Sequence, residues 1–203
     1  MQNPLFDIAQ DSTSPGVLSL LESDYRNADD ILRLYLSALT GLDPTVVRKR
    51  WLQKPGTQPP VGIDWAAVGV ERVETWGTPY QHGDKPQTIE DPDVVTRTSW
   101  QTLRCVASFY GTNAAQLADT FREGLLLSQN DAQLRRFGMT TQGVEDNIVH
   151  LPDFLFEQWT DRYDVIFKVG RSVTRTFGVR TIVAAGVELI TEKQNDASDL
   201  AGK

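Results

Sequence analysis

The sequence contains few of the residues on which disulfides and metal sites depend. Among its 203 residues, cysteine occurs once, at Cys105, and histidine twice, at His82 and His150. A lone cysteine forms no disulfide within the chain, so we expect synthesis in a reducing, intracellular compartment. Two separate histidines, without a second cysteine or an HExxH motif, do not complete a zinc site. We therefore expect neither a metal nor a cofactor.

Long apolar runs and basic segments are also missing. No stretch approaches the ~20 consecutive apolar residues of a membrane helix, so we expect no membrane partner. The net charge is −7, and acidic side chains are concentrated in residues 1–30, 84–95 and 188–203. A protein that wraps nucleic acid usually presents a basic stripe, which this distribution does not provide. Acidic ends of this kind are typical of solvated segments.

Apolar periodicity predicts an α+β fold, with a mostly antiparallel sheet and helices packed on one side. Residues 94–110 give the strongest strand pattern, because Leu103, Cys105, Ala107 and Phe109 share one parity. Further strands are expected over residues 64–76, over residues 139–150 (as strand or loop), and as two long strands within residues 152–190 that turn near Gly178. Residues 77–93 are expected to form a loop.

Helices are expected in four places: after Asn27 as far as Gly41, from Asp43 to Trp51, after Asn113, and over residues 131–138. Asn27 can cap the first helix, which Gly41 ends. The apolar face of this helix is expected to be wide and to comprise Ile31, Leu32, Leu34, Tyr35, Leu36, Ala38 and Leu39. The dipeptide Asp43-Pro44 is typical of a helix start.

The helix after Asn113 is expected to seat the helical layer on the sheet. Asn113 and Gln116 have the spacing of a capping box. Leu117, Phe121 and Leu125 recur every four residues and form the stripe that packs on the strand before it.

We expect one domain over residues 23–192, after an extended arm over residues 1–22 and before a disordered tail over residues 193–203. A proline-rich connector is expected to interrupt the domain at residues 52–63. Its prolines exclude a central strand and favour an extended, stiff segment.

No pattern in the chain supports catalysis. The junction Tyr110-Gly111-Thr112 lacks the lysine of a phosphate loop and the flanked serine or cysteine of a nucleophile elbow. Cys105 lies on the apolar parity of its strand, where a buried, inert thiol is expected. The adjacent carboxylates Glu90/Asp91 and Glu145/Asp146 lie in loops without the apolar surroundings that separate two acidities. We therefore expect a protein that is not an enzyme.

Several aromatic, proline and arginine side chains are candidates for binding other proteins. The predicted interface residues are Trp51, Pro59, Pro60, Arg162, Arg171 and Arg175. Arginine and aromatic residues are favoured at protein contacts. An equally weighted interpretation is a solvated outer face of the sheet.

Three motifs, taken in order, resemble phage neck terminator proteins, a tail-terminator-like family. The first is Arg50-Trp51-Leu52-Gln53 followed by KPGTQPPVGIDWAAVGV; the second is Ser108-Phe109-Tyr110-Gly111 with Ala114, Gly124, Gln129-Asn130, Leu134 and Gly138-Met139; the third is Pro152, Trp159, Arg162, Asp164, Arg171, Arg175 and Phe177. Together they span about residues 48–190.

The resemblance implies a tail-terminator-like fold and a structural virion protein made in the host's bacterial cytoplasm. Relatives form a ring, generally of six subunits, at the head-proximal end of the tail. The implied partners are other copies of the chain, the tail tube protein, the head-completion or stopper protein and, in a contractile tail, the sheath protein. DNA would only pass through the lumen, which the excess acid would help by repelling it.

Two expectations follow for assembly. The arginines of residues 162–180 and the acidic loop of residues 84–95 are candidates for the opposite faces of a head-to-tail contact. The alternative function is a monomeric adaptor that binds partners through the proline and tryptophan segment or through a sheet edge. The mass in solution separates the two, because only the terminator is expected to form rings.

Overall fold

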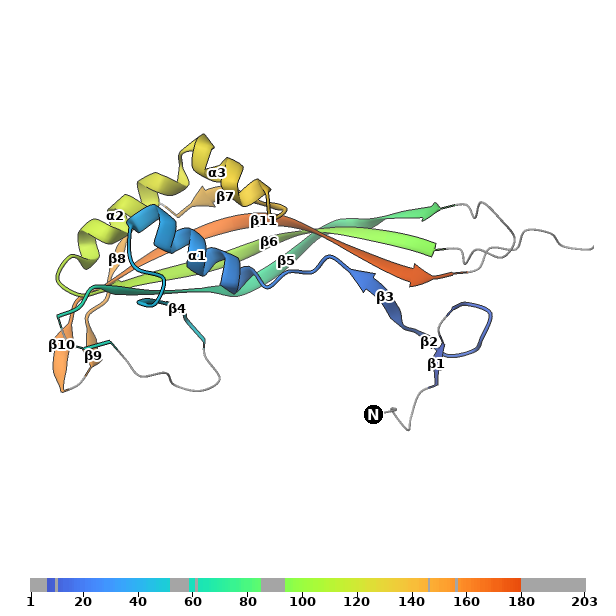
Figure 1. The fold of residues 1–203 in the computed structure, drawn as a ribbon, viewed down its shortest axis with the longest axis horizontal. Helices are drawn as coiled ribbons and strands as arrows, with labels where there is room; N and C mark the ends of the chain where they lie inside the picture. Colours follow the sequence, from blue (N-terminus) through green and yellow to red (C-terminus); the bar gives the residue numbers. More distant parts are fainter. Residues whose placement is uncertain are drawn as a thin grey trace, which may run out of the picture.

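Three long antiparallel strands form the centre of the molecule. They are β5 (Trp65–Asp84), β6 (Val94–Tyr110) and β11 (Arg162–Gly178). The computed structural model describes residues 7–9, 11–51, 59–60, 62–84, 94–145, 147–155 and 157–179. Within these residues the strands run in the order β5-β6-β11, and three helices lie against one face of the curled sheet (Figure 1). The predicted α+β class is confirmed.

Shorter strands extend the sheet at both edges. β4 (Val47–Lys49) pairs in parallel with β5, whereas β3 (Leu20–Ser23), β7 (Met139–Val144) and β8 (Val149–His150) pair antiparallel with β11. Two further pairs lie outside the sheet: β1 (Ile8–Ala9) with β2 (Val17–Leu18), and β9 (Asp153–Leu155) with β10 (Gln158–Thr160). The end of the predicted N-terminal arm, residues 1–22, falls inside β3.

The first predicted helix is confirmed as α1 (Ala28–Thr40). The Asn27 side chain accepts a hydrogen bond from the Asp29 amide, and Gly41 ends the helix at a φ of 73°. The apolar face was predicted too broadly, because Leu34 is 52% exposed. The buried side is set by Leu32 and Leu36, one turn apart, which places Leu34 on the opposite side.

The other two helices, α2 (Ala114–Leu125) and α3 (Ser128–Arg135), follow β6 directly. Phe121 and Leu125 are buried as predicted, while Leu117 is only partly buried. The capping box was wrong, because Asn113 makes no side-chain cap and instead donates its Nδ2 to Asp64. None of the helices in the described residues is long and apolar enough to cross a membrane.

The core lies between the helices and the inner face of the sheet. Leu103, Cys105, Ala107 and Phe109 of β6 are all 0% exposed, which confirms the predicted parity. Burial raises the pKa of the Cys105 thiol to about 12, so this group stays protonated at neutral pH. The predicted burial of this thiol is thereby confirmed.

The three long strands continue well beyond the helices as a twisted ribbon (Figure 1). We call this ribbon, residues 73–84, 94–102 and 170–178, the arm; it is a different part of the chain from the N-terminal segment of residues 1–22. Trp76 and Trp100 are register partners on neighbouring strands of the arm, on the face away from the helices, and both are at least half exposed. The arm therefore presents large aromatic side chains that no helix covers.

The helix predicted from Asp43 to Trp51 was wrong. Asp43 instead accepts hydrogen bonds from the amide and the hydroxyl of Thr45, closing a turn that leads into β4. Aspartate before proline is as typical of a turn as of a helix start. The β-branched Val46 and Val47 then favour the strand that pairs with β5.

The loop predicted over residues 77–93 was wrong in its first half. β5 continues to Asp84 and pairs with β6 up to Val94, with an irregularity between Trp76 and Tyr80 that absorbs the glycine and proline. Several predictions lie outside the described residues: most of the connector at residues 52–63, the acidic loop over residues 85–93, the second long strand after Gly178 with Arg180, and the tail over residues 193–203.

Candidate functional site

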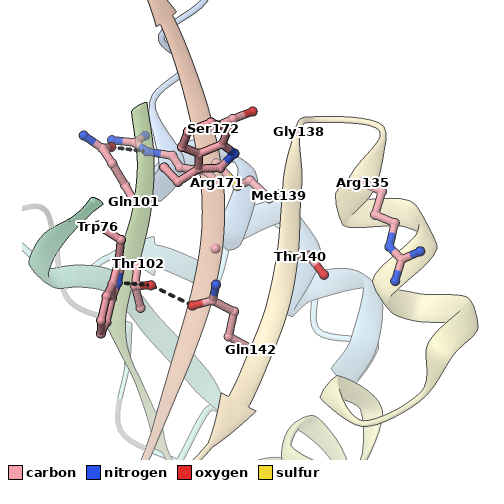
Figure 2. A pocket seen from close by; sticks show the side chains of 12 residues that line it. Trp76, Gln101, Thr102, Arg135, Gly138, Met139, Thr140, Gln142, Arg171 and Ser172 are labelled. Carbon is pink, nitrogen blue, oxygen red and sulfur yellow. Dashed lines mark hydrogen bonds between the residues drawn. The ribbon is translucent and has the colours of Figure 1, made fainter. Parts of the chain in front are cut away.

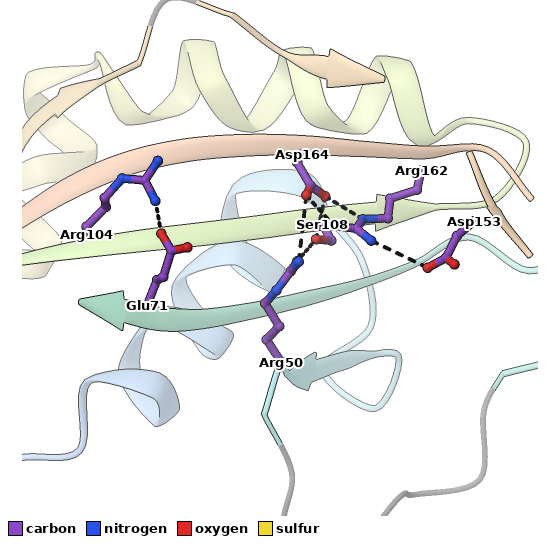
Figure 3. Close-up of polar contacts among 7 residues, drawn as sticks. All are labelled: Arg50, Glu71, Arg104, Ser108, Asp153, Arg162 and Asp164. Atoms are coloured by element: carbon purple, nitrogen blue, oxygen red, sulfur yellow. Dashed lines mark hydrogen bonds and ion pairs between the residues drawn. The ribbon is translucent and has the colours of Figure 1, made fainter. Parts of the chain in front are cut away.

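Residues from the three motifs meet at one carboxylate, that of Asp164 on β11 (Figure 3). Arg162 donates to it from Nε and Nη2, at 2.9 and 2.6 Å. Ser108 of β6 donates its hydroxyl to the same group at 2.6 Å. Arg50, just after β4, donates to the Ser108 hydroxyl and lies 3.7 Å from Asp164 Oδ2. We call these four residues the latch.

The carboxylate at the centre of the latch is buried and ionised at neutral pH. Asp164 is 5% exposed. Burial alone would raise the pKa of its carboxyl, but the hydrogen bonds from Arg162 and Ser108 and the charges of Arg162 and Arg50 outweigh it and hold that pKa below its ordinary value. The hydrogen bond to Asp164 in turn raises the pKa of the Arg162 guanidinium. The charges satisfy one another and fasten Arg50 to the sheet.

A second set of contacts fastens the chain a few residues further on. The rings of Trp65 and Tyr110 stack at 4.0 Å between centroids, at an interplanar angle of 3°. Asp64 accepts hydrogen bonds from the amide and the side chain of Asn113, at 2.9 and 2.7 Å. Gly111 leaves the space that Asp64 needs, because a Cβ there would lie 2.8 Å from the Asp64 Cα.

Replacing Gly111 with alanine is expected to destabilise this contact. Its φ of 109° is rarely adopted by residues with a Cβ, which costs roughly 1–3 kcal/mol, and the collision with Asp64 adds to that. The matched control is Gly41→Ala, which also has a positive φ, 73°, but nothing within 4 Å of the new Cβ. Chemical denaturation of both variants measures the difference. Equal losses would show that Asp64 does not depend on the glycine.

The predicted interface residue Trp51 lies against Gly69 of β5, on the outer face of the sheet. A Cβ at Gly69 of β5 would come within 2.7 Å of the Trp51 ring, so the glycine makes room for the indole. The Arg50 guanidinium lies 5.6 Å from the ring centroid. Trp51 is nevertheless 54% exposed, and its outer surface is open to a partner.

The three predicted arginines lie in different surroundings. Arg162 belongs to the latch. Arg171 is only 8% exposed: it donates to the Gln101 side chain and to the Arg26 carbonyl, and its guanidinium lies 4.5 Å from the Tyr25 ring centroid. Arg175 is half-buried and donates to Ser99. The charges of Arg162 and Arg171 thus act within the chain, and the interface role of the set stays a prediction.

The β9–β10 hairpin presents an exposed aromatic pair. Phe154 and Trp159 are register partners, 56% and 73% exposed, with an edge contact of 5.4 Å between ring centroids. Leu155 and Thr160 instead border a small space shared with Pro59 and Pro60, of which Pro59 is buried and Pro60 exposed. The predicted proline residues therefore lie beneath this hairpin.

A groove of about 740 Å³ lies at the base of the arm (Figure 2). Its lining includes Trp76, Trp100, Thr102, Met139, Gln142 and Gly170. The Trp76 indole donates to the Thr102 hydroxyl, which donates to the Gln142 side-chain oxygen, each at 2.8 Å. This chain of hydrogen bonds connects β5, β6 and β7 across the floor of the groove.

The interface residues predicted from the sequence include neither the groove tryptophans nor the aromatic pair of the hairpin. Trp100 carries a usable signal, because it points outward on the strand predicted over residues 94–110, where a large aromatic residue has no core to enter. Trp159 belongs to the third motif, whereas its partner Phe154 belongs to none of the motifs and to no periodic pattern. The groove is lined by residues of β5, β6, β7 and β11, and no local sequence pattern predicts that these four strands lie together there.

The histidine and carboxylate side chains considered above as possible catalytic or metal-binding groups make contacts within the fold. His150 lies 3.0 Å from Asp161 and stacks on Tyr163 at 4.5 Å. In the part of the chain that the structure describes, no group of three or more histidine, cysteine, aspartate or glutamate residues is placed to hold a metal ion. Glu145 pairs with Arg104, which also contacts Glu71.

Comparison with known proteins agrees with the motifs. The family model described as phage neck terminator protein matches residues 27–194. No curated protein matches the chain. The matched region contains the latch, the groove, the hairpin and the whole described arm. Because the match covers most of the sequence, the chain belongs to the phage neck terminator protein family.

Proposed function

We propose that this protein is the tail terminator of a phage. In this role a ring of identical subunits, six in number, caps the head-proximal end of the tail tube, ends its elongation and binds the head-completion proteins. Family membership implies a structural role at the virion neck. The match over residues 27–194 is the observation that carries the proposal, and the ring, its size and its partners extend it.

The shape of the subunit supports a role in bridging neighbours. The arm projects beyond the helices, and the β9–β10 hairpin lies at the other end of the long axis (Figure 1). Each carries exposed tryptophan, which is enriched at protein contacts. Within the proposal, Trp51, Pro60 and Arg175 are further contact residues, since each retains exposed surface.

The charge of the chain fits the passage of DNA through a ring. The net charge of −7 gives each subunit a field that repels phosphate. DNA would then pass through the lumen without binding its wall. The tail tube protein, the stopper protein and, in a contractile tail, the sheath protein are the proposed neighbours.

Loss of the protein from an infecting phage tests the proposal. A phage with a nonsense codon in this gene is expected to produce tail tubes of uncontrolled length and filled heads without tails, as counted by negative-stain microscopy. Expression of the wild-type chain from a plasmid is expected to restore complete particles. Tails of normal length joined to heads, in the absence of the protein, would contradict the proposed role.

A further inference from the structure

We propose that the two exposed aromatic surfaces of the subunit are complementary to one another. The β9–β10 hairpin of one copy inserts Phe154 and Trp159 into the groove of the next copy. This inference rests on the proposed ring and names the contact that closes it. The occupant of the groove is thus a second copy of this chain.

The hairpin is built to hold its aromatic pair away from its own subunit. Phe154 and Trp159 share one face of the hairpin, while Leu155 and Thr160 on the other face border the proline segment. Arg162 of the latch reaches Asp153 at 3.5 Å and ties the hairpin to the sheet. An isolated two-stranded hairpin is marginally stable, so these contacts fix a projection whose apolar face has no cover in the described subunit.

The groove has the size and chemistry to receive that pair. Its volume of about 740 Å³ lies in the range of preformed binding cavities, roughly 300–1,000 Å³. Trp76 and Trp100, both at least half exposed, supply apolar and aromatic surface. The hydroxyl groups of Thr140 and Ser172, also in the lining, can accept the indole N–H that a buried tryptophan must donate.

The placement of the two surfaces gives a head-to-tail contact. The hairpin lies at one end of the long axis, and the arm, with the groove at its base, extends toward the other (Figure 1). Contact between two different surfaces of identical subunits repeats around an axis and closes into a ring when the rotation permits. A two-fold dimer would require one surface to face itself, which this pair does not do.

Charge complementarity favours the same pairing. Over residues 151–161 the chain carries Asp153, Glu157 and Asp161 and no arginine or lysine. Asp153 pairs with Arg162 and Asp161 with His150, so exposed Glu157 is the carboxylate that a neighbouring copy would meet first. On the groove side, Arg135 in the lining already pairs with Asp131, and exposed Lys168, two residues before Gly170, supplies the positive charge that faces the hairpin. Opposite charges across an interface speed association and disfavour wrong pairings.

Variants of each surface test the inference separately. The hairpin variant is Phe154→Ala with Trp159→Ala, and the groove variant is Ser172→Trp, which fills the groove from an exposed position. The control is Leu34→Ala, which removes an equally exposed apolar side chain from α1. Light scattering and sedimentation velocity give the mass of each, and circular dichroism verifies that each is folded. Both test variants are expected to lose the ring, and the control to keep it.

Mixing the two variants provides the decisive measurement. Each retains one good surface, so an equimolar mixture is expected to form a one-to-one dimer that cannot grow into a ring. A hairpin variant that still assembles into rings would overturn the inference and leave the proposed ring intact. A wild-type chain that stays monomeric at every concentration would overturn the ring in solution, and the hairpin contact with it. A mixture that remains monomeric, although each variant alone has lost the ring, would also overturn the pairing.

Discussion

The Asp164→Ala variant is expected to lose about 3–5 kcal/mol of unfolding free energy. The substitution removes the carboxylate that neutralises Arg162 and Arg50 and leaves both guanidinium groups without their shared partner in a largely buried site. It also removes the acceptor of the Ser108 hydroxyl. Urea denaturation followed by circular dichroism measures the loss.

Two further substitutions serve as controls. Asp161→Ala removes a carboxylate whose side chain is 64% exposed and pairs with His150, and it is expected to cost at most about 1 kcal/mol. Asp164→Asn keeps the shape and an acceptor but removes the charge, so its loss is expected to lie between the other two. An Asp164→Ala variant as stable as Asp161→Ala would show that the latch contributes nothing to the fold.

The pH dependence supplies an independent readout of the same carboxylate. The pKa of Asp164 is lowered in the folded chain relative to its ordinary value of 3.8. Its contribution to stability is therefore present above about pH 4 and is lost as the pH falls through the lowered pKa. The melting temperature of the Asp164→Asn variant is expected to fall less steeply below pH 4 than that of the wild type. Parallel acid profiles would contradict the assignment.

The Phe121→Ala variant is expected to lose about 3–5 kcal/mol, because it empties the centre of the core. Phe121 of α2 is 1% exposed and contacts the rings of Phe109 and Phe167, at 5.5 and 5.4 Å between centroids. It is the side chain that fixes α2 to both central strands. The aromatic signal in near-ultraviolet circular dichroism is expected to weaken together with the stability.

Leu126→Ala is the matched control for this substitution. Leu126 directly follows α2 but is 59% exposed, so its removal is expected to change stability by no more than about 0.5 kcal/mol. Equal effects of the two substitutions would show that α2 is not seated by its phenylalanine. The comparison separates loss of core packing from loss of apolar surface in general.

The sequence predicted elements whose burial follows from local periodicity. β6 was predicted with its bounds, because its alternating residues face a core on one side and the other face tolerates threonine and arginine. Asn27 and Gly41 marked α1 because caps act within a few residues. Asp43-Pro44 led to a wrong helix prediction, because the same dipeptide begins both turns and helices. Pairing with β5 stabilises residues 47–49 as a strand instead.

The candidate site depended on contacts between distant residues. Arg50 and Ser108 lie 58 positions apart, and Ser108 and Asp164 lie 56 apart. The resemblance to neck terminators grouped these residues, but only the folded sheet shows that they meet. The irregularities of β5, which place Trp76 beside Trp100, also leave no periodic trace in the sequence.

The pairing of β6 with β11 has a mechanical consequence. The two strands face each other from Arg162 and Tyr110 to Gly178 and Val94 without a register shift, whereas β5 is interrupted twice. Tension along the strands, between the arm tip and the helical body, would load all of these hydrogen bonds in shear at the same time. The β6–β11 pair is therefore expected to resist such tension better than the interrupted pairing of β5 with β6.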